Sequence, residues 1–252
     1  MNIVEQVRAA GVVGAGGAGF PTHVKLGGKA GVVIANGAEC EPLLRVDQLL
    51  MQRRAARVVR GMELCMEATG AARGVIATKA HYGAAVKALR NALGERTDIT
   101  LHLMESYYPS GDEKSIIFEV AGRVVPSGRL PLDVGCVVCN VATLAGIADA
   151  AEGKPVTDKD VTVGGDVPFP VTVPIGTPMR LLLALSGFKG TPAGHALIVG
   201  GPCMGRVEED WDAPVTKTTG GLLLFKRTHP LIQRRSLTPE RQLKLARAVC
   251  CQ

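Results

Sequence analysis

The sequence is poor in aromatic residues, which make up 4% of its 252 positions, and no apolar run approaches the roughly 20 residues that span a bilayer. Its first ten residues, MNIVEQVRAA, include a glutamate and an arginine and so lack the apolar centre of a signal peptide. Seven cysteines at irregular spacings do not resemble the framework of a secreted disulfide protein. We therefore expect a cytoplasmic protein with reduced thiols and no membrane insertion.

Hydrophobic residues (46%) and glycine (31 residues) are abundant, which supports a sizeable core in one large domain or two smaller ones. The net charge of +6 is concentrated at one end, because eight Lys and Arg residues but a single Glu follow Pro214. This segment is either a solvated helical face that supports a neighbouring module or a surface for an acidic partner. It is almost without base-stacking aromatics, so we expect no nucleic-acid partner.

Strand and helix patterns alternate over the first 150 residues. Short apolar runs predict strands, and segments with one apolar side predict the helices between them. The predicted strands are 32–35, 75–78, 100–103 and 137–139, and the predicted helices are 2–10, 46–68, 83–93, a segment through 116–120, and 141–151. This alternation indicates an α/β fold with a largely parallel sheet that is covered on both faces.

The pattern changes to short β-rich runs near residue 154. Strands at 161–163, 171–173 and 197–199 around one helix at 178–186 predict a small α+β domain. After Gly205 we expect loops and one basic helix at about 238–250. The predicted domains are therefore 1–153, 154–206 and 207–252.

The glycine-rich segment 14–19, Gly-Ala-Gly-Gly-Ala-Gly, satisfies G-x-G-x-x-G. A dinucleotide fingerprint should follow a strand and open a helix, but here a helix precedes the loop and Pro21 follows it, so a Rossmann dehydrogenase is excluded. Glycines let main-chain N–H groups approach a phosphate or a flat ring, and Lys25 adds a positive charge nearby. The alternative is a tight packing turn.

Polar clusters follow several predicted strands. The turn 36–42, Asn-Gly-Ala-Glu-Cys-Glu-Pro, ends the first strand, the segment 108–113, Tyr-Pro-Ser-Gly-Asp-Glu, follows the third, and Asn140 follows the fourth. Open parallel sheets bind ligands at the carboxyl ends of their strands. These clusters therefore predict one shared site for a polar heterocycle.

Four motifs in this order make the chain resemble a known family. They are Gly-Gly-Ala-Gly-Phe-Pro-Thr at 16–22, the turn 36–42, Tyr-Pro-Ser-Gly-Asp-Glu-Lys at 108–114, and Val-Val-Cys-Asn-Val at 137–141. The resemblance is to the flavin-binding subunit of respiratory NADH dehydrogenase and to the C subunit of the Rnf complex. It is closest to the cobalamin reductases of propanediol-utilisation microcompartments, and it covers nearly the whole chain.

The resemblance implies a first domain that binds FMN and oxidises NADH, then a β-grasp domain of the soluble-ligand-binding type at 154–206. It also implies a site, residue by residue. The glycines of the loop would wrap FMN, Lys25 would reach its phosphate side, and Phe20 would stack on the NADH adenine. The implied cofactor-binding residues are Gly14, Gly16, Gly17, Gly19, Phe20, Lys25, Asn36, Ala38, Glu39, Cys40, Glu41, Tyr108, Gly111, Asp112, Glu113, Asn140 and Thr143.

Two positions depart from the respiratory pattern. Ala15 stands where the respiratory subunit has an arginine, and residues 26–29, Leu-Gly-Gly-Lys, contain no second aromatic for the adenine. FMN binding survives these changes more easily than tight NADH binding.

Two of the cysteine positions, Cys136 and Cys139, form a C-x-x-C pattern. In an extended strand residues three apart point to opposite faces, so we expect buried structural thiols and no metal site. Relatives continue into 4Fe-4S motifs, and Cys250 matches the first ligand of one. A tetranuclear cluster needs four thiolates, so we expect no cluster in this chain.

The leading hypothesis is an NADH-dependent flavin oxidoreductase module that sends electrons through iron–sulfur clusters to cobalamin, without a catalytic acid–base group of its own. A corrinoid adenosyltransferase or another electron acceptor would be its partner, and a microcompartment shell protein a further one. The alternatives are a docking scaffold for a corrinoid enzyme or shell, and an Rnf-type membrane electron-transport component.

Overall fold

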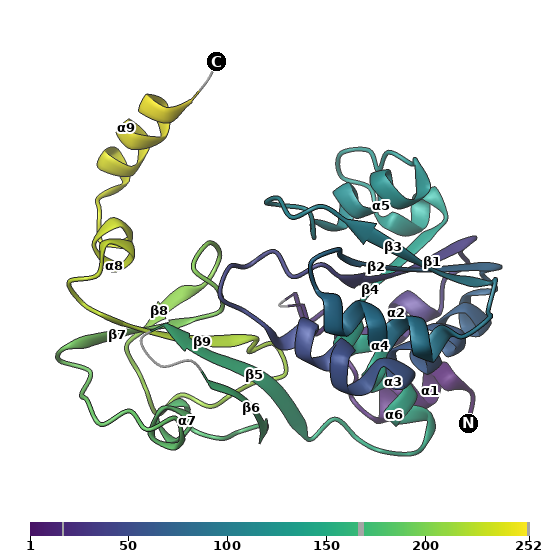
Figure 1. Ribbon diagram of the computed structural model, residues 1–252, viewed down its shortest axis with the longest axis horizontal. Helices are drawn as coiled ribbons and strands as arrows, with labels where there is room; N and C mark the ends of the chain where they lie inside the picture. Colours follow the sequence, from purple (N-terminus) through teal and green to yellow (C-terminus); the bar gives the residue numbers. More distant parts are fainter. Residues whose placement is uncertain (17, 166–168, 251–252) are drawn as a thin grey trace.

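The computed structural model describes residues 1–16, 18–165 and 169–250, with the side chain of Phe169 left aside. They form two units, each built on one sheet, and a helical C-terminal segment (Figure 1). The first unit holds a four-stranded sheet and the second a five-stranded sheet. No helix in the described part of the chain is long and apolar enough to cross a membrane.

The four-stranded sheet is parallel throughout and has the strand order β3-β2-β1-β4. Its strands are β1 (Val32–Gly37), β2 (Arg73–Lys79), β3 (Ile99–Met104) and β4 (Cys136–Asn140), and its helices are α1 (Ile3–Ala9), α2 (Thr22–Leu26), α3 (Val46–Thr69), α4 (Gly83–Leu93), α5 (Glu113–Ala121), the 3-10 turn η1 (Pro131–Val134) and α6 (Val141–Ala151). The predicted strands and helices occur in the predicted order, and α2 and η1 are elements that the sequence analysis did not predict.

Alternate residues of β1 pack against different helices. Val33 and Ala35 belong to the core shared with α3, α4 and α6, whereas Ile34 packs with Ile116 and Ile117 of α5 on the other face. The sheet is therefore covered on both faces, as the continuous apolar strands predict.

The two cysteines of the C-x-x-C pattern obey the same alternation. Cys139 lies in the core on the α3 side and Cys136 in the core on the α5 side. Both thiols are buried and free. Their opposite directions agree with the prediction that this pair cannot share a metal.

The second unit contains a mixed sheet with the strand order β6-β5-β9-β7-β8 and one helix packed on it. Its elements are β5 (Asp158–Gly165), β6 (Phe169–Pro174), α7 (Met179–Leu185), β7 (His195–Val199), β8 (Arg206–Glu208) and β9 (Gly221–Lys226). β9 pairs in parallel with β5 and antiparallel with β7. This is the small α+β unit that the sequence predicts.

The expectation of loops directly after Gly205 is wrong, whereas the helix expected at about 238–250 is present at Pro239–Val249. β9 is the central strand of the second sheet, so that sheet extends beyond residue 206. Leu222 and Leu224 pack with α7, and Leu223 and Phe225 pack on the opposite face. A strand buried on both faces is a continuous apolar run without alternation, and such a run is hard to recognise as a strand from periodicity.

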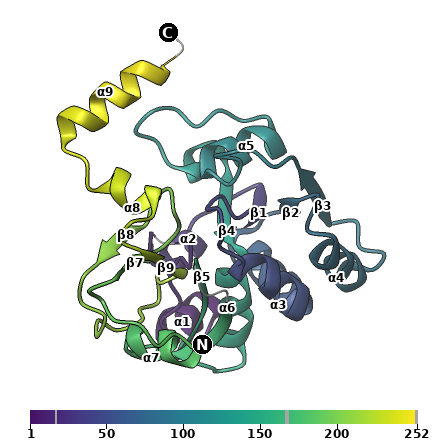
Figure 2. The same cartoon turned by 60° about the vertical axis from the view of Figure 1, so that its left-hand side comes forward.

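The C-terminal segment forms α8 (Pro230–Arg235) and α9 (Pro239–Val249). α9 has no buried residue and projects away from both sheets in both views (Figure 2). Its exposed basic side chains agree with a solvated helical face. Cys250, the expected first cluster ligand, is exposed at its C-terminal end.

Candidate functional site

A cavity of about 630 Å³ opens at the carboxyl ends of the parallel strands, within the usual range for small-molecule sites. It brings together most of the residues that the motifs predict. The predicted residues that line it are Gly16, Asn36, Ala38, Glu39, Cys40, Glu41, Tyr108, Gly111, Asp112, Glu113 and Asn140. Gly17 lies outside the described residues.

Five predicted residues in the described part of the chain do not line the cavity. Gly14 donates its N–H to Phe20 O at 2.8 Å and so closes the glycine loop, in which Gly19 has a φ of +63°. Thr143 Oγ1 accepts a hydrogen bond of 3.0 Å from Ala15 N, which fastens this loop to the first turn of α6. These residues shape the loop without lining the cavity.

Lys25 is held inside the first unit. Its Nζ contacts Glu113 Oε1 at 3.0 Å and donates to Val138 O at 2.9 Å, and it lies 5.8 Å from the centre of the Phe20 ring. Lys25 thus positions Glu113 at the edge of the cavity. Its own ammonium does not line the cavity, and Phe20 is 41% exposed.

The turn after β1 and the loop before α5 are fastened to each other. Asn36 Nδ2 donates to Gly111 O at 2.9 Å, and Gly111 N donates to Cys40 Sγ at 2.7 Å. A Cβ at position 111 would lie 2.1 Å from Ala38 O, so only glycine fits here without movement. Two segments 71 residues apart in sequence therefore form one continuous wall.

Two carboxyl groups, those of the buried Asp47 and the half-buried Glu39, line the cavity. Burial, and next the charge of Asp47, raise the pKa of Glu39 to about 7. Burial raises the pKa of Asp47 to about 6, although Asn140 Nδ2 donates to its Oδ2 at 2.8 Å and favours the charged form. Glu39 therefore exchanges its proton near neutral pH.

The second unit supplies the opposite wall, which sequence reasoning missed. Lys159 of β5 and the glycine-rich turn after β7 line the cavity with residues from the segment before β9. These residues are Lys159, Gly200, Gly201, Met204, Gly205, Thr218 and Gly220. The Gly-Gly-Pro-Cys-Met-Gly run at 200–205 is the one signal that could have pointed here, since clustered glycines let main chain approach a ligand.

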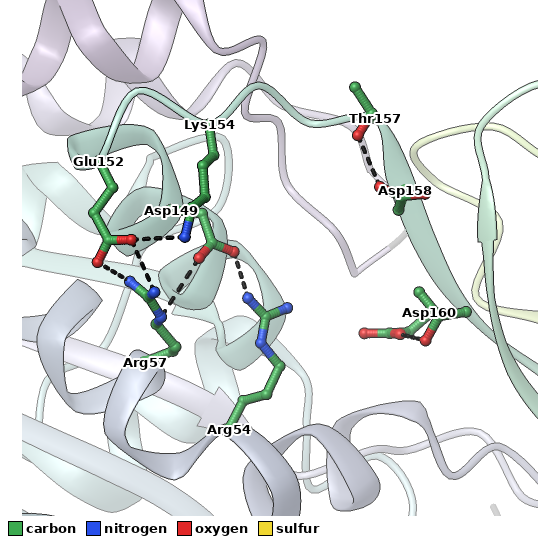
Figure 3. Close-up of polar contacts among 9 residues, drawn as sticks. Arg54, Arg57, Asp149, Glu152, Lys154, Thr157, Asp158 and Asp160 are labelled. Carbon is green, nitrogen blue, oxygen red and sulfur yellow. Dashed lines mark hydrogen bonds and ion pairs between the residues drawn. The ribbon is translucent and has the colours of Figure 1, made fainter.

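A larger cavity of about 740 Å³ lies between the two units and shares Ala15, Val46, Ala142 and Lys159 with the first. Around it, Arg54 pairs with Asp149, and Arg57 pairs with Glu152, which also accepts from Lys154 at 2.8 Å (Figure 3). These arginine, lysine and carboxylate side chains satisfy one another. We therefore place the candidate cofactor site in the smaller cavity, where the predicted residues converge.

The described residues contain no group of three His, Cys, Asp or Glu side chains arranged to hold a metal ion. The polar groups of the site are main chain, carboxyl and amide groups, one lysine, the Cys40 thiol and the Tyr108 and Thr218 hydroxyls. The site suits an organic ligand with a flat polar ring.

The fold is that of an α/β domain with a cavity at the carboxyl ends of its parallel strands, where such sheets bind ligands. Residues 7–149 match the model of the Nuo51 FMN-binding domain. The chain belongs to this family, and the resemblance drawn from the four motifs is confirmed.

Two curated relatives extend the match over the second unit. The chain is 51% identical over 252 residues to the cobalamin reductase PduS of Salmonella typhimurium, covering 99% of this chain and 55% of the relative. It is 40% identical over 234 residues to the C subunit of the Na(+)-translocating ferredoxin:NAD(+) oxidoreductase complex of Acetobacterium woodii, covering 89% and 52%. The chain therefore spans about half the length of these relatives.

A solved structure supports the architecture. An NAD+-reducing [NiFe]-hydrogenase in the air-oxidized state aligns with a TM-score of 0.73 and 26% identity, over 92% of this chain and 48% of that chain. An NAD+-reducing [NiFe]-hydrogenase in the H2-reduced state aligns with a TM-score of 0.75 at 23% identity, which is a likeness of fold. The predicted α/β fold class with its mixed second sheet is confirmed.

Proposed function

We propose that the cavity at the strand ends binds FMN, and that the chain is the flavin-carrying part of an NADH-oxidising electron-transfer protein. The observation that carries this proposal is convergence: Gly16, the turn 36–41, the loop 108–113 and Asn140 lie far apart in sequence and line one cavity. Membership of the FMN-binding family supports the same ligand.

The residues present fit an isoalloxazine ring. Glycine main chain at positions 16, 111, 200 and 201 allows a flat ring to approach closely. Main-chain and amide groups around the turn after β1 offer donors and acceptors to a pyrimidine edge. Bound FMN would supply hydride acceptance followed by release of single electrons, and the protein would bind and orient it.

The chain's own residues then have three tasks. Asn36, Gly111 and Cys40 fix the two loops that form one wall. Glu39, with its pKa of about 7, holds or releases a proton beside the ligand. Met204 and the turn 200–205 limit the access of water from the second unit. None of these tasks requires a catalytic acid–base pair.

The wider reaction rests on the relatives. One is named a cobalamin reductase and another a subunit of a ferredoxin:NAD(+) oxidoreductase complex. We propose NADH as the electron donor, 4Fe-4S clusters in the full-length protein as the next carriers, with Cys250 as a first ligand, and cobalamin as the final acceptor. A corrinoid adenosyltransferase would receive the reduced corrinoid, in the cytoplasm or inside a microcompartment.

Flavin fluorescence tests the first step. Adding FMN to the purified protein should quench the fluorescence saturably, and NADH added without oxygen should then bleach the flavin absorbance. Lack of saturable quenching rejects the proposal. Quenching without bleaching leaves FMN binding in place and removes NADH as the donor.

A docking scaffold is the competing function. The exposed α9, with Leu243, Leu245 and Val249 at the surface, is the feature that favours it. Capture of a corrinoid enzyme or a shell protein should then be equal with and without FMN. A capture that requires α9 but not the flavin supports the scaffold, whereas dependence on reduced flavin supports electron transfer.

A further inference from the structure

Lys159 is an unusual lysine, because only 8% of its surface is exposed and its ammonium group has few hydrogen-bond partners. It lies in β5 of the second unit and lines the candidate flavin cavity. Among the described residues its side chain forms a single hydrogen bond, a long one of 3.4 Å from Nζ to Ala15 O. An ammonium group has three donors, so most of its hydrogen-bonding capacity remains unused in a buried place.

Lys159 is the one positively charged side chain among the described residues that line this cavity. The charged residues that line it in the described part of the chain are Lys159 and five carboxylic acids: Glu39, Glu41, Asp47, Asp112 and Glu113. A phosphate near most of these groups would meet repulsion. An anionic ligand group therefore has one favourable place, beside the Lys159 ammonium.

Three elements meet at that place. Ala15 N donates to Thr143 Oγ1 in the first turn of α6, while Ala15 O accepts from Lys159. Gly16, the next residue of the glycine loop, lines the cavity. The N-terminal end of the 11-residue helix α6 adds the partial positive charge of its main-chain N–H groups.

Three carboxyl groups attract the ammonium when no ligand is bound. They are Asp47, Asp160 and Glu39, and their charges oppose the effect of burial on the Lys159 pKa, which is lowered. Burial favours the neutral form of Lys159, and a phosphate would restore the charged form. An anionic ligand thus relieves an unfavourable feature of the free protein.

We propose that Lys159 binds the phosphate of FMN, so that the second unit completes the cofactor site. This inference rests on the proposed FMN function. It assigns the phosphate to a residue outside the 7–149 segment that matches the family domain. Lys25 is already bound to Glu113 and Val138 O, which leaves Lys159 as the phosphate ligand.

Comparing FMN with riboflavin, which has the same ring and no phosphate, tests the assignment. In Lys159→Met we expect FMN to bind about 10- to 100-fold more weakly, the effect of losing a hydrogen bond to a charged group, while riboflavin affinity stays within about twofold. Lys159→Arg should keep most of the preference for FMN. Lys189→Met, at an exposed lysine of the second unit, is the matched control.

The outcomes separate the alternatives. Equal losses for FMN and riboflavin, or no loss for either, overturn the assignment, because Lys159 would then face the ring or serve the fold alone. If wild-type protein binds neither flavin, the FMN function fails and the phosphate site with it. If Lys159→Met does not fold, Lys159→Gln, which keeps a donor for Ala15 O without the charge, gives the same comparison.

Discussion

The carboxylate of Glu41 accepts hydrogen bonds from the main-chain N–H of Met204, at 2.6 Å, and of Cys203, at 2.8 Å. Glu41 follows β1 in the first unit, whereas Met204 belongs to the turn after β7 in the second. On the far side of this turn Arg235 donates to Pro202 O at 2.7 Å. The turn is thus held by a carboxylate on one side and a guanidinium on the other.

This arrangement gives the first prediction. Glu41→Gln leaves one acceptor oxygen, so one charge-assisted hydrogen bond becomes a weaker neutral one and the other is lost because the amide NH2 faces a main-chain N–H. This change should cost about 1–2 kcal/mol locally. Main-chain amides in 200–205 should exchange hydrogen about 5- to 30-fold faster, and FMN should bind more weakly because its wall has loosened. Hydrogen exchange by mass spectrometry measures this.

The control for Glu41 is Glu95→Gln, at an exposed position after α4. It should leave exchange in 200–205 unchanged. If Glu41→Gln also leaves it unchanged, Glu41 does not hold the turn. Its carboxylate would then be free to contact a cofactor, as the family resemblance implies for this residue.

The second prediction concerns pH. The pKa of Glu39 is raised by burial to about 7 in the folded protein, against 4.5 for an ordinary glutamate. Between these values the folded state binds the proton and the unfolded state does not, so the stabilising effect is complete below about pH 4.5 and is lost as pH rises through 7. Glu39→Gln cannot titrate. The variant should be more stable than wild type at pH 8, by about 1–3 kcal/mol, with a smaller difference at pH 5.

Urea unfolding of the flavin-free protein at pH 5 and pH 8 measures the effect. Glu105→Gln, at an exposed glutamate, should change the free energy of unfolding by the same amount at pH 5 and at pH 8. A Glu39→Gln protein whose advantage does not grow with pH would show that Glu39 is not a buried acid.

The third prediction tests the close approach of the two loops. A methyl group at position 111 would meet Ala38 O at 2.1 Å and Cys40 Sγ at 2.8 Å. Gly111→Ala should therefore move the loop before α5 and weaken FMN binding by at least about tenfold, the effect of about 1.4 kcal/mol. Gly83→Ala is the control, because a Cβ at Gly83 meets nothing within 4 Å. Equal FMN affinity in both variants would refute the tight wall.

The sequence predicts one wall of the site well and the other poorly. Asn36, Glu39 and Gly111 are recognisable because each lies at or beyond the carboxyl end of a parallel strand, where ligand sites gather. Lys159 and Met204 belong to the second unit. The glycine run 200–205 around Met204 is a signal for a ligand, but it does not indicate contact with the first unit, and Lys159 has no such signal. Their position depends on how the two sheets pack, and local periodicity does not determine packing between units.

A related limit explains the missed strand β9. Leu222, Leu223, Leu224 and Phe225 are buried on both faces of the sheet, so the run lacks the alternation of a half-exposed strand. The strands and helices from β1 to α6, by contrast, have either helical periodicity or flanking turns, and their predicted order agrees with the fold. Whether a strand lies at the centre or the edge of a sheet depends on the whole fold, so the local sequence does not show that β9 is central.

The last prediction concerns the support beneath the site. Helices α3 and α6 cross at Gly61, where a Cβ would lie 1.9 Å from Leu144 O. Main chain cannot yield as a flexible side chain can, so Gly61→Ala must separate the helices. Overpacking of this kind should cost about 3 kcal/mol, or about 6–12 °C in Tm for a chain of this size.

Gly146→Ala within α6 is the matched control, because its Cβ would make ordinary contacts of 3.5 Å and 3.9 Å with Val12. Alanine is the better helix former, so this variant should be neutral or up to about 1 kcal/mol more stable. Differential scanning calorimetry compares the two. Since α6 carries Asn140 at its N-terminus and Thr143 in its first turn, Gly61→Ala should also weaken FMN binding, and a Tm loss without that change would mean that the site is insensitive to the position of α6.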